Sequence, residues 1–551
     1  METYMIKIIK NISLILSLLA LTACSQQPQT TKTVDVEKER IKAHLEFLAD
    51  DFLEGRDTGS RGYEIAANYV ASEFKQLGLQ PAGENGFMQR APFRRGYLDQ
   101  QSTKAIIHTE QGEVALKYPQ DYMMGTVMNS TESSVKAETV FVGYGLIAEK
   151  YNYDDYKDLD VKGKIVVILT GRPKSWPSEE GAHLASGTEK ARHAAQRGAV
   201  GIVTLHTPKR EKVRSYTTSL NYLGTPSLRW LDTEGNPHGV RPEIKGGAYL
   251  NIEAGKKLFA QAPTSLDAIF KLDEEDKEIQ GFDLNATIEL AAKSRHESIS
   301  SPNVLAVLPG SDPKLKNEYV VLTAHLDHIG LAKDVTTKDR INNGAMDNAS
   351  GVSILLETAR VLVNSERPRR SILFTVVTGE EKGLLGASYF VNNPTVPLNA
   401  MVANVNIDMP VLLYDFADVI AFGANHSSMG QIVESAAGQL GIGLSPDPMP
   451  EQAIFTRSDH YNFVKKGVPS VFLMTGFTSK TEGEDGGKVW GEFFAKHYHK
   501  PSDSLELPIN YDAAKVFADV NIRIALTTAN QDERPYWLAD SFFGNTFSNK
   551  N

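Results

Sequence analysis

The second half of the chain contains four short apolar segments that are rich in Val, Ile, Leu and Phe. They cover residues 319–324, 371–378, 401–407 and 468–474. Such runs are typical of strands buried on both faces of a parallel sheet. Between the first two, residues 351–363 place apolar side chains at helical spacing. This alternation predicts an α/β fold with a mostly parallel mixed sheet flanked by helices.

The first half of the chain has a different pattern. Residues 37–52 and 62–79 have the apolar spacing of two helices, separated by the turn-rich segment LEGRDTGSRG. From about residue 104 to about residue 281 the pattern predicts many short strands with turns. We therefore predict a β-rich domain, residues 104–281, inserted into an α/β domain made of residues 38–103 and 282–551.

Acidic residues and histidines follow the first three predicted strands. In open α/β sheets ligands bind outside the carboxyl ends of the strands, so these side chains are expected to open into one crevice. An aspartate before the 351–363 helix and a histidine beyond the fourth strand can reach the same crevice. The residues concerned are His325, Asp327, Asp347, Glu380, Glu381, Asp408 and His499.

This set of side chains suits a site for two zinc ions. Imidazole nitrogens and carboxylate oxygens are usual zinc ligands, and positions left open mark a catalytic site. Three ligand carboxylates and two zinc dications together leave one surplus positive charge, which favours a bridging hydroxide over a neutral water. Zinc also lowers the pKa of bound water to about 7, so that a hydroxide can form near neutral pH. Glu380, beside a ligand but pointing elsewhere, is predicted to be the general base. Asp327 is predicted to accept the second N–H of His325. Helix caps or turns would explain each residue singly, but not their joint occurrence.

The order of motifs TAHLDH, GAMDNASG, GEEKGLLGAS, VNIDM and HYHKPSD resembles the zinc peptidases of the M28 family, of the aminopeptidase Y and bacterial leucyl aminopeptidase type. The resemblance implies the zinc exopeptidase fold and a cis peptide bond after Asp347. It assigns His325 and Asp408 to one zinc, Glu381 and His499 to the other, Asp347 as bridge and Glu380 as base. Tyr498 matches a tyrosine that hydrogen-bonds the substrate carbonyl oxygen as it becomes an oxyanion. The inserted segments FVGYGLIAEKYNYDDYKDLDVKGKIVVIL and KARHAAQRGAVGIVTL resemble a protease-associated (PA) domain.

The composition and the single cysteine bear on the class of protein and on its cellular compartment. The 551 residues are 41% apolar and 23% charged, as in ordinary soluble enzymes, and the net charge of −10 gives no indication of nucleic-acid binding. The single cysteine, Cys24, rules out an internal disulfide framework. It follows an apolar core, residues 12–20, that is too short to span a bilayer.

This arrangement resembles a bacterial lipoprotein signal. It predicts a signal peptide at residues 1–23, a lipidated Cys24 that anchors the chain to a membrane, and a flexible tether at residues 24–37. An ordinary signal peptide cut after Ala23, or an uncleaved anchor, are the alternatives. Ser25 follows the cysteine in place of the aspartate that retains enterobacterial lipoproteins at the inner membrane. We therefore expect a cell-envelope protein anchored to the outer membrane and facing the periplasm or the cell surface.

The predicted function is that of a di-zinc aminopeptidase that removes N-terminal residues from peptides. A carboxypeptidase or dipeptidase that uses Arg457 to hold a free carboxylate is an alternative, and a non-catalytic binding protein of the same fold is another. Glutaminyl cyclisation is disfavoured, because cyclases of this fold use a single zinc. Ser458, after Arg457, is explained either as a helix N-cap or as part of a specificity pocket. His183, His193 and His206 lack ligand spacing and are predicted to lie at the surface or in loops. Neither the preferred N-terminal residue nor the oligomeric state follows from the sequence.

Overall fold

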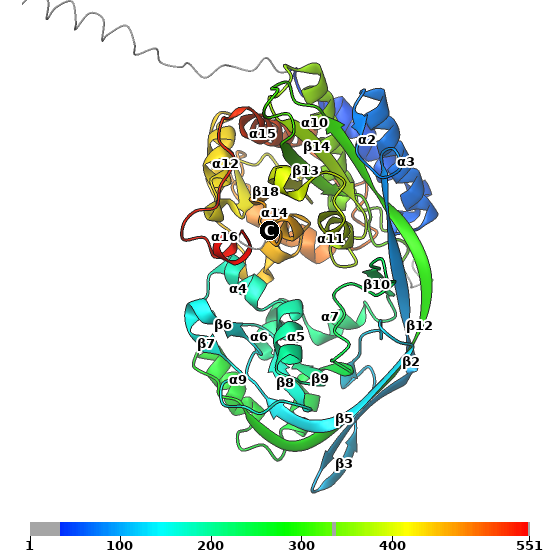
Figure 1. The fold of residues 1–551 in the computed structure, drawn as a ribbon, viewed down its shortest axis with the longest axis vertical. Helices are drawn as coiled ribbons and strands as arrows, with labels where there is room; N and C mark the ends of the chain where they lie inside the picture. The colour runs from blue at the N-terminus through cyan, green and yellow to red at the C-terminus, as the bar shows by residue number, and fades with distance from the viewer. Residues whose placement is uncertain (1–33, 333–337, 549–551) are drawn as a thin grey trace, which may run out of the picture.

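The computed structural model describes residues 34–332 and 338–548. The predicted signal peptide, Cys24 and most of the tether lie outside these residues. The described chain has a larger and a smaller half, and two long, curved strands run from one to the other (Figure 1). No helix in the described ranges is both long enough and apolar enough to cross a membrane.

The larger half contains the predicted parallel sheet. β18 (Ser470–Thr475), β15 (Met401–Ile407), β13 (Tyr319–His325) and β14 (Ser371–Val377) lie side by side in this order and run parallel. β16 (Asp418–Phe422) is antiparallel to β18 and carries the edge strand β17 (Gly443–Ser445). The end of β12 (Phe282–Leu308) is antiparallel to β14. The predicted mostly parallel mixed sheet is confirmed.

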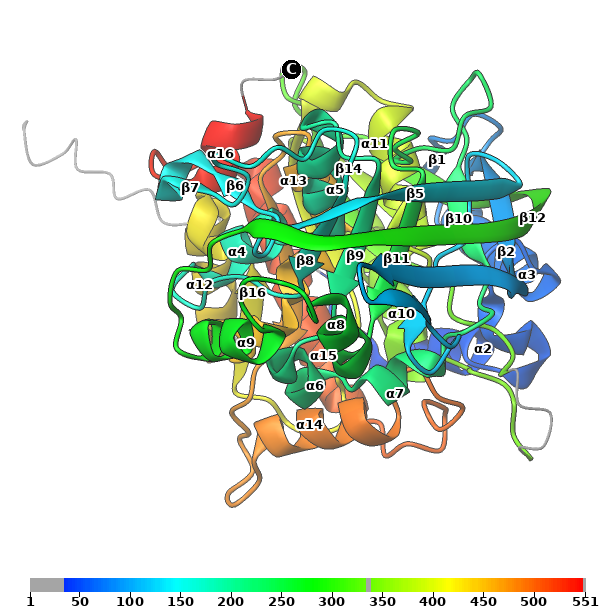
Figure 2. The same cartoon turned by 90° about the horizontal axis from the view of Figure 1, so that it is seen from below.

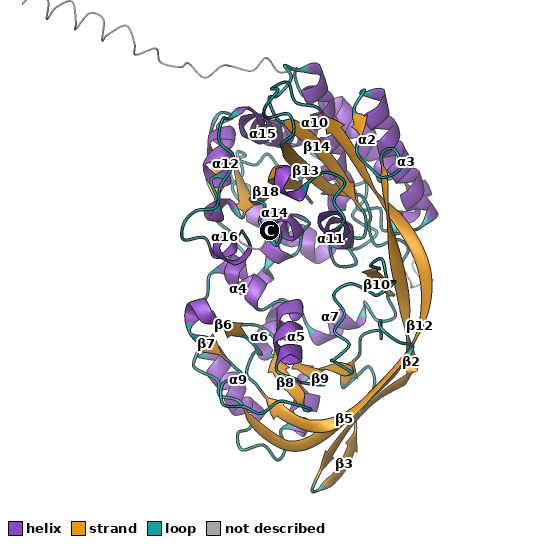
Figure 3. Cartoon of the chain, in the orientation of Figure 1, coloured by secondary structure: helices purple, strands orange, loops and turns teal. Residues whose placement is uncertain are grey.

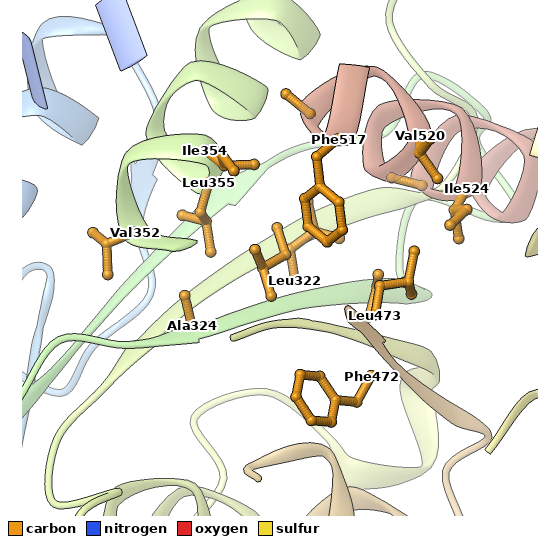
Figure 4. Packing of buried hydrophobic residues seen from close by; sticks show 14 of the residues in the cluster. Leu322, Ala324, Val352, Ile354, Leu355, Phe472, Leu473, Phe517, Val520 and Ile524 are labelled. Carbon is orange, nitrogen blue, oxygen red and sulfur yellow. The ribbon is translucent and has the colours of Figure 1, made fainter. Parts of the chain in front are cut away.

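Side chains of β13 alternate between two apolar cores, as the pleat of a strand requires. Leu322 and Ala324 point into the larger core, where they meet Leu355 and Phe517 from two helices (Figure 4). Val321 belongs to the core on the opposite face. Because both faces are covered, the strand carries apolar residues without a break, which explains the run that identified it.

Helices cover both faces of this sheet (Figure 3). The larger core is closed by helices from both ends of the chain and from the middle, and the smaller one by two short helices. Those on the larger core are α2 (Lys38–Leu48), α3 (Arg61–Gln76), α10 (Gly351–Asn364), α12 (Met429–Gly438), α14 (Gly486–Lys496) and α15 (Tyr511–Asn530). Those on the smaller core are α11 (Leu385–Asn392) and α13 (His460–Val464).

Two antiparallel strands, β2 (Met88–Thr109) and β12, connect the halves, and with β5 (Glu132–Phe141) they lie side by side (Figure 2). The predicted domain boundary at residue 104 falls within β2, whereas residue 282 is the first of β12. The domain limits therefore remain a prediction. β5 leads into three further parallel strands of the smaller half, β8 (Ile165–Leu169), β9 (Gly201–Leu205) and β11 (Gly246–Leu250).

The smaller half also contains helices where the sequence pattern predicted mainly strands and turns. Several begin at a Ser, Thr or Asn whose side chain accepts a hydrogen bond from the first turn. These helices are short, so their apolar spacing is easily confused with that of strands. They are α4 (Ser178–Leu184), α5 (Gly187–Gln196), α6 (Pro208–Val213), α7 (Tyr216–Leu220), α8 (Ile252–Leu258) and α9 (Leu266–Glu274).

The two halves meet through polar contacts and one aromatic cluster. Ser178 Oγ donates to Asp447 Oδ2 over 2.7 Å, and Arg172 Nη2 donates to the Pro450 carbonyl over 3.3 Å. The C-terminal helix α16 (Phe542–Phe547) places Phe543 against both halves, with ring centroids 5.9 Å from His183 and 4.7 Å from Phe455.

The structure corrects the prediction for the three histidines of the insertion. His183, His193 and His206 are buried, and the first two lie in helices α4 and α5. His183 Nδ1 lies 2.5 Å from the Tyr461 hydroxyl of the larger half, and His206 Nδ1 lies 2.6 Å from the Tyr249 hydroxyl. The surface placement was wrong for all three, and the loop placement was wrong for His183 and His193, whereas His206 lies in the loop between β9 and α6. Periodicity did not reveal the packing that encloses these rings.

Candidate metal centre and its surroundings

Parallel strands bring the predicted site residues to one edge of the sheet. His325 ends β13 and is in register with Val377, the last residue of β14. Glu380 and Glu381 therefore follow β14 at the level of His325, and Asp408 directly follows β15. Since carboxyl ends of parallel strands meet at the same edge, local strand patterns are sufficient to bring these four residues together.

Asp347 lies between two clusters of potential metal ligands. Its Oδ1 is 3.3 Å from His325 Nε2, which is itself 3.0 Å from Asp408 Oδ1. Its Oδ2 is 3.3 Å from His499 Nε2, which is 3.0 Å from Glu381 Oε2. Each carboxylate oxygen of Asp347 thus faces a different histidine. The peptide bond between Asp347 and Asn348 is cis.

The chemistry of these groups fits divalent cations. His325, Asp347 and Asp408 present ligand atoms within 4.8 Å of one another, as do His328, Asp347 and Glu381. Neither ring nitrogen of His499 has a hydrogen-bond partner among the described residues. Buried polar atoms normally have partners, so unpartnered nitrogens that face carboxylates are what a metal site requires of its ligands.

Buried charge perturbs the titration of the same groups. Burial would lower the pKa of His325, but the carboxylates of Asp408 and Glu380 raise it well above its ordinary value. Burial raises the pKa of Glu380 far above that of a free glutamate, although the charge of His325 opposes this effect. A carboxylate with a raised pKa beside a cluster of ligands is suited to accept a proton.

Asp327 supports the site differently from the prediction. His325 Nδ1 lies 3.1 Å from the backbone carbonyl of Asp327, not from its carboxylate. The carboxylate instead accepts the N–H of Glu380 over 3.1 Å and the N–H of Glu381 over 3.3 Å, together with the hydroxyl of Thr58. Asp327 therefore holds the backbone of the adjacent glutamates, and the predicted partner of the His325 N–H was wrong.

Sequence reasoning missed two residues that hold predicted ligands. His328 Nδ1 lies 2.6 Å from Glu381 Oε1, and its side chain is buried. Asp503 accepts the backbone N–H groups of Met346 and Asp347 over 2.9 and 3.1 Å. The available signal was position alone, because His328 follows Asp327 and Asp503 ends the motif HYHKPSD.

A third missed residue, Arg56, lies behind the site in the segment predicted only to be turn-rich. The residue is only 1% exposed. It donates to the carbonyls of Leu326, Asn343 and Gly344 over 2.9, 2.7 and 3.2 Å, and also to that of Leu48. Leu326 follows His325, and Gly344 is three residues before Asp347. Arg56 therefore connects two segments that carry potential ligands.

A small cavity opens at the site. Asp347, Glu380, Asp408, Arg457 and Tyr498 provide its polar lining. The remaining lining is apolar and consists of Met409, Ile454, Phe472, Met474 and Phe494. The Tyr498 ring stacks on His499 with centroids 3.8 Å apart, and its hydroxyl accepts a hydrogen bond from Arg457 Nη2 over 3.2 Å. The cavity can therefore accept an apolar side chain next to a polar group.

Ser458 and Arg457 had two competing interpretations. α13 begins at His460 with Asp459 at the N-cap position, and no side chain caps it. Ser458 instead donates its hydroxyl to Asp408 Oδ2 and accepts from Asn406. The N-cap interpretation is wrong, and Ser458 orients a predicted ligand while Arg457 lines the cavity.

Two regions of the chain match known protein families. Residues 303–525 match the model of peptidase family M28, and residues 135–232 match the PA domain. The "Probable lipoprotein aminopeptidase LpqL" of Mycobacterium tuberculosis is 26% identical over 491 residues, which cover 86% of this chain and 81% of that protein.

Two other relatives match over a shorter length. Aminopeptidase YwaD of Bacillus subtilis is 28% identical over 242 residues, covering 43% of this chain and 46% of the relative. The "probable leucine aminopeptidase 2" of Aspergillus oryzae is 25% identical over 256 residues, covering 45% of this chain and 48% of the relative. The match therefore spans about half the length of these two proteins.

A solved structure supports the fold. An aminopeptidase from Aneurinibacillus sp. strain AM-1 superposes with a TM-score of 0.53 at 20% identity, covering 91% of this chain and 95% of that one. This similarity supports the fold, and the two family matches identify a peptidase family M28 domain at residues 303–525 and a PA domain at residues 135–232.

Proposed function

We propose that this protein is a di-zinc aminopeptidase. The observation that carries the proposal is the position of Asp347, whose two carboxylate oxygens face His325 and His499 separately. In the proposed assignment His325, Asp347 and Asp408 would hold one zinc ion, and Asp347, Glu381 and His499 would hold the other. When bound, zinc lowers the pKa of a coordinated water and polarises a carbonyl.

The remaining residues have proposed roles in proton transfer and orientation. Glu380 takes a proton from the attacking water and returns it to the departing amine. Tyr498 donates its hydroxyl hydrogen to the carbonyl oxygen as negative charge develops there. The free α-amine of the substrate lies next to acidic groups, which favour its positive charge, while the apolar wall of the cavity receives the first side chain.

Two tests separate this mechanism from its alternatives. Glu380→Gln is expected to retain two zinc ions per chain by elemental analysis and to lose activity by a factor of about 10²–10⁴, the range for a general base. Glu366→Gln, an exposed change of the same chemistry, serves as control. Turnover of Glu380→Gln at the wild-type rate would refute the role of the base.

The direction of attack needs a separate experiment, because Arg457 in the cavity favours a carboxypeptidase as the second candidate. A ten-residue peptide is expected to lose residues one at a time from its amino end. N-acetylation should block this reaction, whereas C-terminal amidation of so long a peptide should not. Mass spectrometry of the product ladder decides the matter, and residues lost from the carboxyl end would establish the second candidate.

The proposed location is the cell envelope, with a lipid on Cys24 and the outer membrane as anchor. The motif before Cys24 supports this location, as does the similarity to LpqL, which is named as a probable lipoprotein aminopeptidase. Peptides are the proposed substrates.

A further inference from the structure

A second cavity, of about 580 Å³, lies between the two halves of the protein. One wall is the start of α4 in the PA domain, and the other is formed by β16, the start of α12 and the residues after β17. None of its lining residues belongs to the proposed metal centre or lines the catalytic cavity. Sites for small ligands typically have volumes of roughly 300–1,000 Å³, so this cavity is large enough for a ligand of its own.

Glu179 of α4 and His426 of the larger half face each other in this cavity. They are only 7% and 6% exposed. Glu179 Oε1 accepts the N–H of Gly423 over 2.7 Å. Glu179 Oε2 and His426 Nε2 are 2.8 Å apart, but neither of these two atoms makes a hydrogen bond with any described residue. Buried polar atoms normally have hydrogen-bond partners, so this pair indicates a bound group that supplies them.

The charge of the lining indicates the sign of that group. Four carboxylates line the cavity, those of Glu179, Glu180, Glu434 and Asp447. Among the described residues no lysine or arginine lines it, and of the four carboxylates only Glu180 has such a cation within 4.0 Å, Lys150 at 2.9 Å. Arg172 acts on Asp447 at longer range and donates to two backbone carbonyls. The cavity therefore favours a positively charged ligand.

Size and apolar surface distinguish an organic cation from a metal ion. In the described ranges, both groups of three or more potential metal ligands lie in the proposed metal centre, and none lies in this cavity. Its remaining walls include the apolar side chains of Ile420, Phe422, Leu444 and Leu538. A few polar groups on a mostly apolar wall are typical of a site for an organic molecule.

We propose that this cavity binds a small organic cation, an ammonium or guanidinium group on an apolar chain, and that Glu179 and His426 bind its charged end. Such a ligand contacts both halves and therefore stabilises their junction. It also lies next to the catalytic cavity, because the ring of Phe422 is 5.5 Å, between centroids, from that of Phe472, which lines the catalytic cavity. The inference does not depend on the proposed aminopeptidase function.

Calorimetric titration of the full-length zinc-loaded protein with pentylamine tests the site. Saturable binding is expected for pentylamine but not for the neutral 1-pentanol. Glu179→Gln keeps an acceptor for the Gly423 N–H and removes the charge, so it should weaken binding by about tenfold to hundredfold, the range for hydrogen bonds to charged groups. Unchanged affinity in this variant would place the amine elsewhere, for example at the metal centre, and overturn the proposal. Equal binding of 1-pentanol would also overturn it.

A second variant keeps the test decisive if Glu179→Gln does not fold. Glu434 lines the cavity from an exposed position on α12, so Glu434→Gln should fold normally and weaken pentylamine binding by about twofold to fivefold, as expected for an exposed charge. Unchanged affinity in Glu434→Gln would then overturn the proposal. The exposed Glu366→Gln, outside the cavity, is the matched control and should bind like the wild type.

Thermal unfolding gives an independent measurement. Saturating pentylamine should raise the unfolding temperature of the wild type and of Glu366→Gln, but not that of Glu179→Gln, because only a ligand bound to the folded state stabilises it. An equal rise in Glu179→Gln would contradict the site.

Two further ligands identify the source and the nature of the cation. Nα-acetyl-lysine N-methylamide presents an ammonium from a peptide backbone. Tighter binding than that of pentylamine would assign the cavity to a basic side chain of a peptide, and weaker binding to a free amine. Binding of Ca²⁺ that depends on Glu179, without binding of pentylamine, would assign the cavity to a metal ion and overturn the proposal.

Discussion

Arg56 illustrates how one buried side chain can organise a site that it does not touch. Its guanidinium donates to carbonyls of residues 48, 326, 343 and 344, which belong to three separate segments. The planar guanidinium of arginine can donate to several carbonyls that lie in different directions, whereas the ammonium of lysine is a compact point charge and cannot reach all of them. The positive charge also faces the carboxylates of Asp503, Asp327 and Asp347.

Arg56→Lys is therefore expected to destabilise the fold by about 1–3 kcal/mol, the cost of leaving buried carbonyls without donors. It should also weaken zinc retention, because the segments that carry His325 and Asp347 lose their common support. Urea unfolding and competition with a chelator measure the two effects. The exposed Arg61→Lys is the control. Wild-type zinc retention in Arg56→Lys would refute the positioning role.

At the scale of elements, α10 begins in close contact with the end of β15. A Cβ on Gly351 would lie 2.2 Å from Asn348 Oδ1 and 2.7 Å from the Ile407 carbonyl. Asn348 in turn donates to the Ile407 carbonyl and accepts from Gly351 and Met409. The helix start, the strand end and the segment of Asp347 therefore form one tightly packed junction.

Gly351→Ala is expected to destabilise the protein and reduce its zinc content, although alanine by itself favours a helix by about 1 kcal/mol over glycine. The backbone carbonyl of Ile407 cannot move away without displacing Asp408, so the steric cost outweighs the helix propensity. Gly438→Ala in α12 is the matched control, since its added Cβ would have no neighbour within 4 Å. Thermal unfolding and elemental analysis compare the two variants, and equal behaviour would contradict the argument.

At the scale of the whole molecule, the larger half and the smaller half of the described chain form one unit. The two halves share β2 and β12 and are joined by the Phe543 cluster. The proposed site lies entirely within residues 325–499, far along the chain from Cys24. Membrane attachment and catalysis should therefore be independent.

Cys24→Ser is expected to leave activity unchanged and to move the protein from the detergent phase into the aqueous phase, because the acyl chains provide the proposed membrane affinity. Phase partitioning in a cloud-point detergent, with activity measured in each phase, tests this expectation. Partitioning of the wild type into the aqueous phase would contradict lipidation. No second cysteine complicates the experiment.

Local sequence patterns were sufficient for the four parallel strands of the larger half and for most of the proposed site. Apolar runs identify buried parallel strands, and the residues directly after such strands must meet at one edge of the sheet. His325, Glu380, Glu381 and Asp408 are therefore predictable from the ends of three strands. The helices α2, α3 and α10 followed from periodicity in the same way.

Tertiary structure alone decided which side chains support and surround the site. Arg56 donates across 270 residues to Leu326, and Asp503 accepts across 156 residues from Asp347. His183 of the PA domain is buried by Tyr461 of the larger half and by the C-terminal helix. Periodicity reports only which face of its own element a side chain occupies. Its partner is determined by how the elements pack, because contacts between distant segments leave no trace in local spacing.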